Sequence, residues 1–278
     1  MDLNELPTAP FRRHPWEVAR ARFFAGVVAA AGAGQQSGAG ALRVLDVGAG
    51  DGYLARQVLQ SLPGGSQVTC VDANYTDLDL ARLAVPPLPG LLFSRSRPLA
   101  AFDVVLLLDV IEHVADDRAF LDEILESCVP PGGVVVVSVP AWEALYGPHD
   151  VALKHFRRYR PAQCRALLQA SGLDVVREGG LFHSLLVPRA LQRVSEVAGS
   201  LVRHARSGAN GADGANGAMG DRPTDRPANL GEWRGGPLLS SVLTAALGVD
   251  TALSARLAQR GLALPGLSYW ALGRRGSA

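Results

Sequence analysis

The chain has 278 residues, enough for one large domain or for one domain with an added subdomain. Hydrophobic residues make up 48% of the sequence and charged residues 19%, which is a globular composition with ample core material. The net charge of only +1 excludes a whole-chain positive field that could hold a nucleic-acid backbone, so we expect no nucleic-acid partner.

The cysteines and the N-terminus indicate a cellular compartment. Cys70, Cys128 and Cys164 are scattered and form no CxxC pair, which argues against a disulfide framework or a zinc site and favours the cytoplasm. The first residues carry acids before arginines, unlike a signal peptide with its basic start. The apolar run 25–33 is far shorter than the ~20 residues of a spanning helix, so we expect no membrane span.

The first half of the chain alternates strand-like and helix-like runs. Strands are predicted at 42–47, 68–72, 91–93, 102–108 and 134–139, and helices at 53–62 and from about 111 to 127. Such alternation predicts an α/β fold with a doubly wound, mostly parallel sheet that has helices on both faces.

The second half breaks this rhythm. A helix at 161–170 and a strand at 173–176 precede two apolar helical patterns, 181–202 and 238–257, and the chain closes with a strand at 267–272. A stretch at about 206–236 is rich in Gly, Ala, Asn, Asp and Pro and predicts a flexible linker. We therefore divide the chain into an N-terminal helical segment (1–40), a core (41–180 plus 263–278) and an apolar helical insertion before the last strand (181–262).

A glycine-rich turn, Gly48-Ala49-Gly50-Asp51-Gly52, follows the first predicted strand and leads into a helix. Glycine lets a ligand approach the backbone closely and permits positive φ. The dinucleotide fingerprint G-x-G-x-x-G would need glycine at position 53, where this chain has Tyr53. An adenosyl ligand is therefore favoured over a nicotinamide cofactor, and a purely structural turn is the remaining alternative. Asp72, at the end of the second strand, could accept both ribose hydroxyls of a bound nucleoside.

Four strings occur in an order that resembles the class I S-adenosylmethionine-dependent methyltransferases of the bacterial small-molecule type. They are VLDVGAGDG from position 44, CVDAN from 70, FDVVLLLDVIEHV from 102 and PPGGVVVVSVPA from 130. The resemblance covers roughly 42–176, and the closing LSYWAL resembles the family's last antiparallel strand. It implies a seven-stranded, Rossmann-like methyltransferase fold that binds S-adenosyl-L-methionine.

The resemblance also implies roles for individual residues. Asp46, Gly48 and Gly50 would hold the methionine end of the cofactor, Asp72 would hold its ribose, and Asp109 would line the cofactor near its sulfur. In one respect the chain departs from the family. The family often has an acid after the third strand that accepts from the adenine amino group, but here that segment reads Ser-Arg-Ser (94–96), so we expect a backbone carbonyl to serve.

The segment Asp109-Val110-Ile111-Glu112-His113 leaves the fourth predicted strand and resembles a string of the ubiquinone-pathway O-methyltransferases. If it is helical from Val110, then Asp109, Glu112 and His113 lie on one face. We expect His113 to act as the catalytic base on an acceptor hydroxyl. Two alternatives stay open: the three residues bind a divalent cation, or Glu112 and His113 merely orient the helix start.

A polar and aromatic loop follows the fifth strand, with the strings YGPHD (146–150) and HFRRY (155–159). Its position at the carboxyl edge of the sheet suits acceptor binding or a lid, although it could equally be a solvated basic loop. Residues 12–16 could likewise cover the cofactor or merely pack the N-terminal helix.

Together these features predict methyl transfer to an oxygen, less favourably a nitrogen or carbon, of a small and apolar or lipid-like acceptor. The apolar insertion could line the acceptor pocket, make peripheral contact with a membrane, or form a packed cap without a ligand. Two rival functions remain: a non-catalytic cofactor-binding partner protein and, disfavoured by Tyr53, an NAD-linked oxidoreductase.

Overall fold

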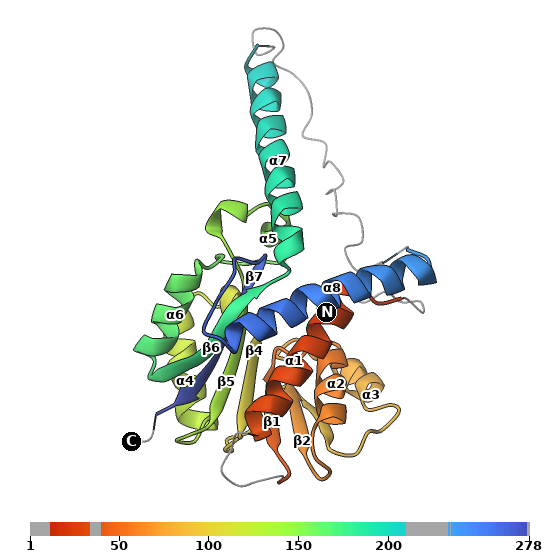
Figure 1. Cartoon of the computed structure of the whole chain (residues 1–278), viewed down its shortest axis with the longest axis vertical. Helices are drawn as coiled ribbons and strands as arrows, with labels where there is room; N and C mark the ends of the chain where they lie inside the picture. The colour runs from red at the N-terminus through yellow and green to blue at the C-terminus, as the bar shows by residue number, and fades with distance from the viewer. Residues whose placement is uncertain (1–11, 34–39, 210–232, 234, 277–278) are drawn as a thin grey trace.

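The computed structural model describes residues 12–33, 40–209, 233 and 235–276 (Figure 1). It contains a seven-stranded sheet in the order β3-β2-β1-β4-β5-β7-β6. The strands are β1 (Arg43–Val47), β2 (Gln67–Val71), β3 (Leu91–Ser94), β4 (Val104–Leu108), β5 (Val134–Pro140), β6 (Leu173–Leu181) and β7 (Ser268–Arg275). All pairings are parallel except those of β7, which runs antiparallel to β5 and to β6. The predicted doubly wound, mostly parallel fold is confirmed.

The centre of the sheet is apolar because helices cover both of its faces. Every residue of β4 is buried, and so are the first six residues of β5. Such continuous β-branched and leucine runs are typical of strands buried on both sides. On one face α1, α2 and α8 pack against the sheet around Phe24 and Trp270, and on the other α4 and α6 pack around Ile124 and Leu168.

The helices are α1 (Pro15–Ala33), α2 (Tyr53–Ser61), α3 (Asp77–Leu83), α4 (Asp117–Cys128), α5 (Pro148–Ala152), α6 (Pro161–Ala170), α7 (His183–Ala209) and α8 (Pro237–Ala258). Two 3₁₀ turns, η2 (Ile111–His113) and η3 (Glu143–Leu145), follow β4 and β5. The short helices α3 and α5 were not predicted from the sequence. Cys70, Cys128 and Cys164 are all buried free thiols.

The predicted helix from about 111 to 127 is wrong at its start. The 3₁₀ turn η2 ends at His113, because the next residue, Val114, has an extended backbone (φ −108°, ψ 127°). A new helix then begins after Asp116, whose side chain accepts a hydrogen bond from the Ala119 N–H. Residues 109–113 therefore do not form the regular helical face on which the predicted grouping of Asp109, Glu112 and His113 depended.

The insertion between β6 and β7 contains α7, which projects away from the sheet, and α8, which lies across α1 (Figure 1). Asp250 of α8 connects the two helices, because its carboxylate accepts hydrogen bonds from the backbone N–H groups of His183 and Ser184 at the start of α7. Most of the predicted linker, 210–232 and 234, lies outside the described residues.

Candidate active site

The turn after β1 is built for close approach to its backbone. Gly48, Gly50 and Gly52 all have positive φ values, of 70°, 53° and 67°. A Cβ on Gly48 would lie 2.9 Å from Val110, and one on Gly52 would lie 2.6 Å from the Phe93 ring. Both φ and space therefore require glycine, and the turn presents bare backbone at the carboxyl end of β1.

Two acids that the sequence analysis assigned to the cofactor, Asp46 and Asp72, border this turn. Asp72 follows β2, and its carboxylate accepts hydrogen bonds from the N–H groups of Gly50 (3.2 Å) and Asn74 (2.9 Å). Asp46 lies within β1 and is only 4% exposed. Burial raises the pKa of Asp46 to about 7, against the favourable charge of Arg20. A cationic ligand group beside Asp46 would supply the countercharge that favours its ionised form.

The N-terminal helix brings two arginines to the same edge of the sheet. Arg20 forms an ion pair with Asp109, with Nη2 2.8 Å from Oδ2. Arg13 pairs with Asp51 in the glycine turn and lies over the Tyr53 ring, 3.9 Å from its centroid. From the sequence we expected 12–16 to cover or pack this region but missed Arg20, whose only signal was its place about one turn beyond them.

Asp109 occupies the end of β4 in a left-handed conformation, with φ 59°. Its N–H donates to the Ser138 carbonyl of β5 (2.8 Å), and its carboxylate accepts from the Ser138 hydroxyl (3.1 Å). Aspartate is among the few non-glycine residues that tolerate this conformation. The Ser138 contacts and the ion pair with Arg20 hold the Asp109 carboxylate at the carboxyl end of β4.

A second group gathers beside η2: Glu112, His113 and His155 each offer a potential ligand atom, all within 4.8 Å of one another. Glu112 is fully buried, and neither carboxylate oxygen has a hydrogen-bond partner. Burial, together with the nearby charge of Asp109, raises the pKa of Glu112 well above its usual range. The His113 and His155 rings are in edge-to-face contact, with centroids 4.6 Å apart. In this group His155 takes the place that the sequence analysis assigned to Asp109.

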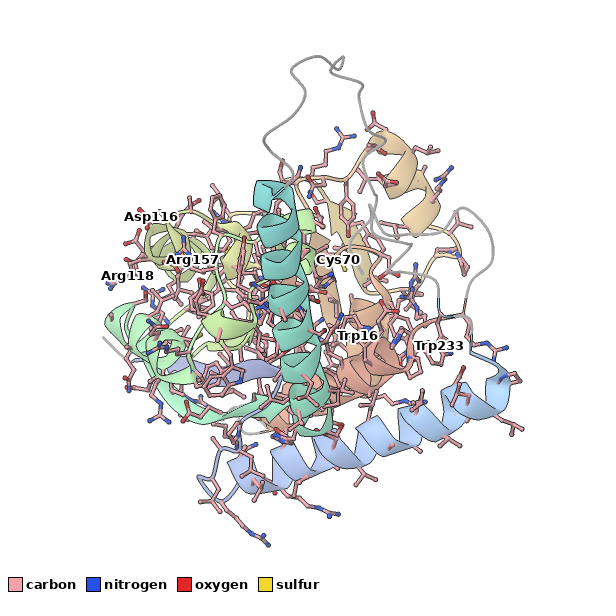
Figure 2. The ribbon with its side chains drawn as sticks, turned by 90° about the horizontal axis from the view of Figure 1, so that it is seen from above. Trp16, Cys70, Asp116, Arg118, Arg157 and Trp233 are labelled. Carbon is pink, nitrogen blue, oxygen red and sulfur yellow. The ribbon has the colours of Figure 1, made fainter. Side chains whose placement is uncertain are left out.

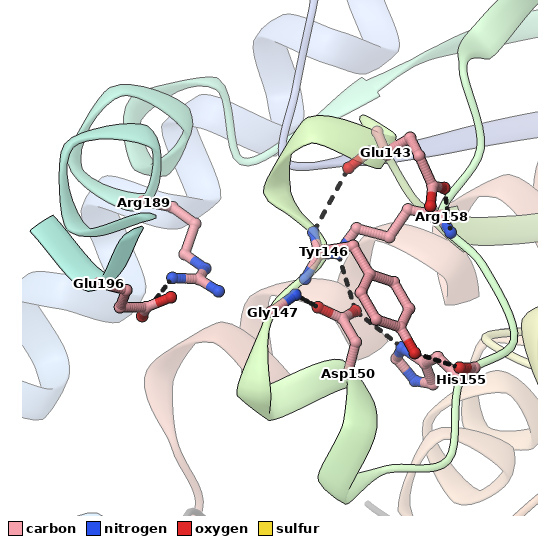
Figure 3. A network of polar contacts seen from close by, with 9 residues as sticks. Glu143, Tyr146, Gly147, Asp150, His155, Arg158, Arg189 and Glu196 are labelled. Carbon is pink, nitrogen blue, oxygen red and sulfur yellow. Dashed lines mark hydrogen bonds and ion pairs between the residues drawn. The ribbon is translucent and has the colours of Figure 1, made fainter. Parts of the chain in front are cut away.

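The loop after β5 is held in place by buried Asp150 (Figure 3). This carboxylate interacts with His155 Nδ1 (2.9 Å), Arg158 Nε (2.7 Å) and the Gly147 N–H (2.9 Å). Burial alone would raise the pKa of Asp150, but the hydrogen bonds from His155 and Arg158 hold it well below its usual range. With Nδ1 engaged by Asp150, the ring of His155 presents its Nε2 edge for other contacts. Most of this polar loop is thus an ordered structure and not a solvated basic segment.

Comparison with known proteins identifies the family of the chain. A family model described as "Methyltransferase domain" matches residues 13–178, which is more than half of the chain. The chain belongs to the S-adenosylmethionine-dependent methyltransferase family. The family's cofactor is S-adenosyl-L-methionine, as the resemblance implied.

Individual relatives match over part of their length. A Mycolicibacterium smegmatis protein named as an S-adenosylmethionine-dependent methyltransferase is 32% identical over 151 residues, covering 50% of this chain and 55% of its own. The ubiquinone biosynthesis O-methyltransferase of Rhizobium rhizogenes is 29% identical over 168 residues, covering 53% and 66%. A solved structure from Galdieria sulphuraria, named for a sarcosine dimethylglycine methyltransferase, has a TM-score of 0.50 at 14% identity and covers 92% of this chain and 85% of that one. The last similarity concerns the fold alone.

The residues at the edge of the sheet fit the family's cofactor. The turn at 48–52 has no side chain at Gly48, Gly50 or Gly52 to hold a ligand away. Asp46 and Arg20 offer opposite charges for an amino acid end, which carries an ammonium and a carboxylate. Asp72 lies at the end of the next strand, where a carboxylate that accepts hydrogen bonds from the ribose hydroxyls is expected.

Proposed function

We propose that the protein transfers a methyl group from S-adenosylmethionine to an oxygen of a small, lipid-like acceptor. One observation carries the proposal: β2, β1, β4 and β5 are neighbours in the sheet, and the segments that leave their carboxyl ends carry Asp72, the glycine turn, Asp109 with His113, and His155. This arrangement supports a cofactor site and a proton-accepting group at neighbouring strand ends, as methyl transfer to a hydroxyl requires.

The cofactor, when bound, supplies a methyl group on a sulfonium, which is an intrinsically good leaving group. The protein's work is then to position both reactants and to remove one proton. Asp46 and Arg20 would hold the methionine end, Asp72 would hold the ribose, and Asp109 would line the cofactor near its sulfur.

His113 is the proposed base that takes the proton from the acceptor hydroxyl. It is exposed, so an acceptor can reach it, whereas its neighbour Glu112 is buried. His155 packs edge-on against His113 and is itself fixed by Asp150, which makes it a positioning residue for the base. The shared location of Glu112, His113 and His155 also suits a divalent cation, and a chelator separates the two roles.

Two observations support an apolar acceptor. The relative from Rhizobium rhizogenes is by name an enzyme of ubiquinone biosynthesis. In this chain Phe156, next to His155, is 58% exposed, and Val151 of α5 is 62% exposed.

An acceptor of this kind resides in a membrane, so we also propose that the protein makes peripheral membrane contact through its helical insertion.

The test is transfer of labelled methyl from S-adenosylmethionine to a lipid extract and, separately, to the water-soluble metabolites of the same cells. We expect label in the lipid fraction as an alkali-stable methyl ether, and far less label with the matched variant His113→Gln. Label only in the water-soluble fraction would contradict the lipid-like acceptor. Stoichiometric cofactor binding with no transfer to either fraction would favour the non-catalytic alternative.

A further inference from the structure

A helix that covers a core normally buries its apolar face and exposes its polar face. Helix α8 shows the reverse arrangement. Its buried residues include Asp250, Thr251 and Ser254. Apart from Ser241 and Arg256, its exposed residues are apolar. Those that run along the other side are Leu238, Leu239, Val242, Ala245, Ala246, Val249, Ala252 and Leu253. Leu238 is 83% exposed and Val249 is 72% exposed. We call this row of eight residues the outer face of α8.

The buried polar residues are all engaged within the protein. Asp250 accepts the two backbone N–H groups at the start of α7, and the Ser254 hydroxyl donates to the Gly180 carbonyl and accepts from Trp270 Nε1. These contacts fix which side of α8 faces the sheet. The outer face is consequently directed away from the rest of the protein, as Figure 2 shows from above.

The composition of α8 matches a lipid environment. Within the described residues, α8 is the one helix long and apolar enough to cross a membrane, with a mean hydropathy of 1.5 over 18 residues. A core helix of a soluble protein passes the same test but is mostly buried, whereas only 17% of this window is buried. Its 22 residues span about 33 Å. Because Asp250 and Ser254 bind it along the sheet, α8 would lie along a membrane surface and not cross it.

Positive charge gathers at the C-terminal end of α8. Four exposed arginines lie there or border the adjoining groove: Arg22 of α1, Arg177 of β6, and Arg256 and Arg260 at the end of α8. The groove runs between α1 and α8 and has a volume of about 430 Å³, with Gly26, Val27 and Ala255 among its small and apolar lining residues. Arginines beside an apolar surface complement the anionic headgroups and acyl chains of a bilayer.

We propose that α8 lies in the plane of an anionic membrane surface, with its outer face among the acyl chains and the four arginines against lipid phosphates. This proposal builds on the lipid-like acceptor of the proposed function, because it places the insertion where such an acceptor resides. The helix of the insertion that contacts the membrane is thus α8 and not the projecting α7.

The experiment is co-sedimentation of the purified full chain with phosphatidylcholine vesicles, with and without phosphatidylglycerol. We expect binding that increases with phosphatidylglycerol and decreases with salt. The double variant Val242→Glu with Val249→Glu should lower the vesicle partition coefficient about tenfold or more, because two charges enter the outer face. The double variant Arg256→Gln with Arg260→Gln should weaken the phosphatidylglycerol dependence and the salt dependence, because two of the four arginines are removed.

Two matched controls carry the same apolar-to-glutamate change elsewhere: Leu99→Glu, at an 88% exposed loop position, and Leu191→Glu, at a 66% exposed position on α7. Both should bind vesicles like the wild type. The proposal is overturned if the wild type does not bind, if Leu191→Glu and not the α8 variant abolishes binding, or if light scattering shows a dimer that the α8 variant dissociates.

Failure of this proposal is distinguishable from failure of the proposed function. Vesicle binding needs neither cofactor nor acceptor, and methyl transfer can be scored on detergent-solubilised lipids. If methyl transfer occurs without vesicle binding, only the proposal that α8 binds a membrane is contradicted. If vesicle binding occurs without methyl transfer, only the proposed methyltransferase reaction is contradicted.

Discussion

Arg20 Nη2 lies 2.8 Å from Asp109 Oδ2, so an ion pair with one partly exposed partner, Asp109 at 36%, joins the N-terminal helix to the residue that follows β4. The Arg20 side chain is 15% exposed. The pair sits where the methionine end of the cofactor is proposed to bind, and a ligand carboxylate can therefore take Asp109's place as the partner of Arg20.

We expect Arg20→Gln to weaken S-adenosylmethionine binding by about 10- to 100-fold, since one hydrogen bond to a charged group contributes ~1.5–3 kcal/mol. Titration calorimetry measures the affinity, and Arg22→Gln, an exposed arginine on the same helix, is the control. Equal affinities for the two variants would show that Arg20 only anchors α1.

Asp72 offers a similar test at the ribose. Asp72→Ala should lower cofactor affinity by the loss of one or two charge-assisted hydrogen bonds, each ~1.5–3 kcal/mol. Because Asp72 also accepts from Gly50 and Asn74, the variant Asp72→Asn keeps the size of the side chain while removing its charge. Exposed Asp77→Ala, after the same strand, is the matched control. Unchanged affinity in Asp72→Ala would rule out the ribose assignment.

Asp46 predicts a pH dependence. Its pKa in the folded protein is raised from 3.8 to about 7 by burial, so between these values the folded state binds a proton that the unfolded state has lost. This contribution to stability is complete below the lower value and is lost as pH rises through about 7. The cofactor-free melting temperature of the wild type should therefore fall more steeply over this range than that of Asp46→Asn.

Cofactor affinity should move in the opposite direction, because Asp46 must ionise to accept an ammonium group. We expect wild-type affinity to rise from about pH 6 to about pH 8, and Asp46→Asn to bind weakly with a flat profile. Exposed Asp174→Asn serves as the control in both experiments. A wild-type affinity that does not change with pH would contradict the proposed contact with the methionine end.

The central strands and the glycine turn after the first of them could be predicted because their signals are local. A buried strand followed by glycines and a helix start occupies only a few consecutive residues around Gly48, and the acid Asp72 directly follows its strand. The apolar runs that mark the central strands are equally local, so these strands were predicted with only small errors at their ends.

The rest depends on contacts between distant segments. His155 joins Glu112 and His113 only because buried Asp150 orders the loop after β5, and no spacing in the sequence reveals that contact. The break at Val114 depends on the competing cap at Asp116. Likewise the apolar pattern of α8 does not tell which side faces outward, since that is decided by the hydrogen bonds of Asp250 and Ser254.

The last prediction concerns the reaction itself: His113 should matter for turnover more than for cofactor affinity. Removal of a general base typically costs ~10²–10⁴ in rate, whereas a residue that only packs would cost stability. We expect His113→Gln to lose turnover on this scale with near-normal cofactor affinity and melting temperature. Asp150→Asn, which weakens the hold on His155, should lose less turnover and should shift the pH profile of kcat.

A chelator distinguishes the base from a metal site at Glu112, His113 and His155. As a base, His113 gives the wild type a turnover that is unaffected by chelator, and Glu112→Gln, which keeps the buried shape, retains most activity. If magnesium restores a chelator-inhibited wild type and both Glu112→Gln and His113→Gln lose that response, the cation role replaces the base. Near-normal turnover of His113→Gln with and without chelator would contradict both roles, because each requires the imidazole at this strand end.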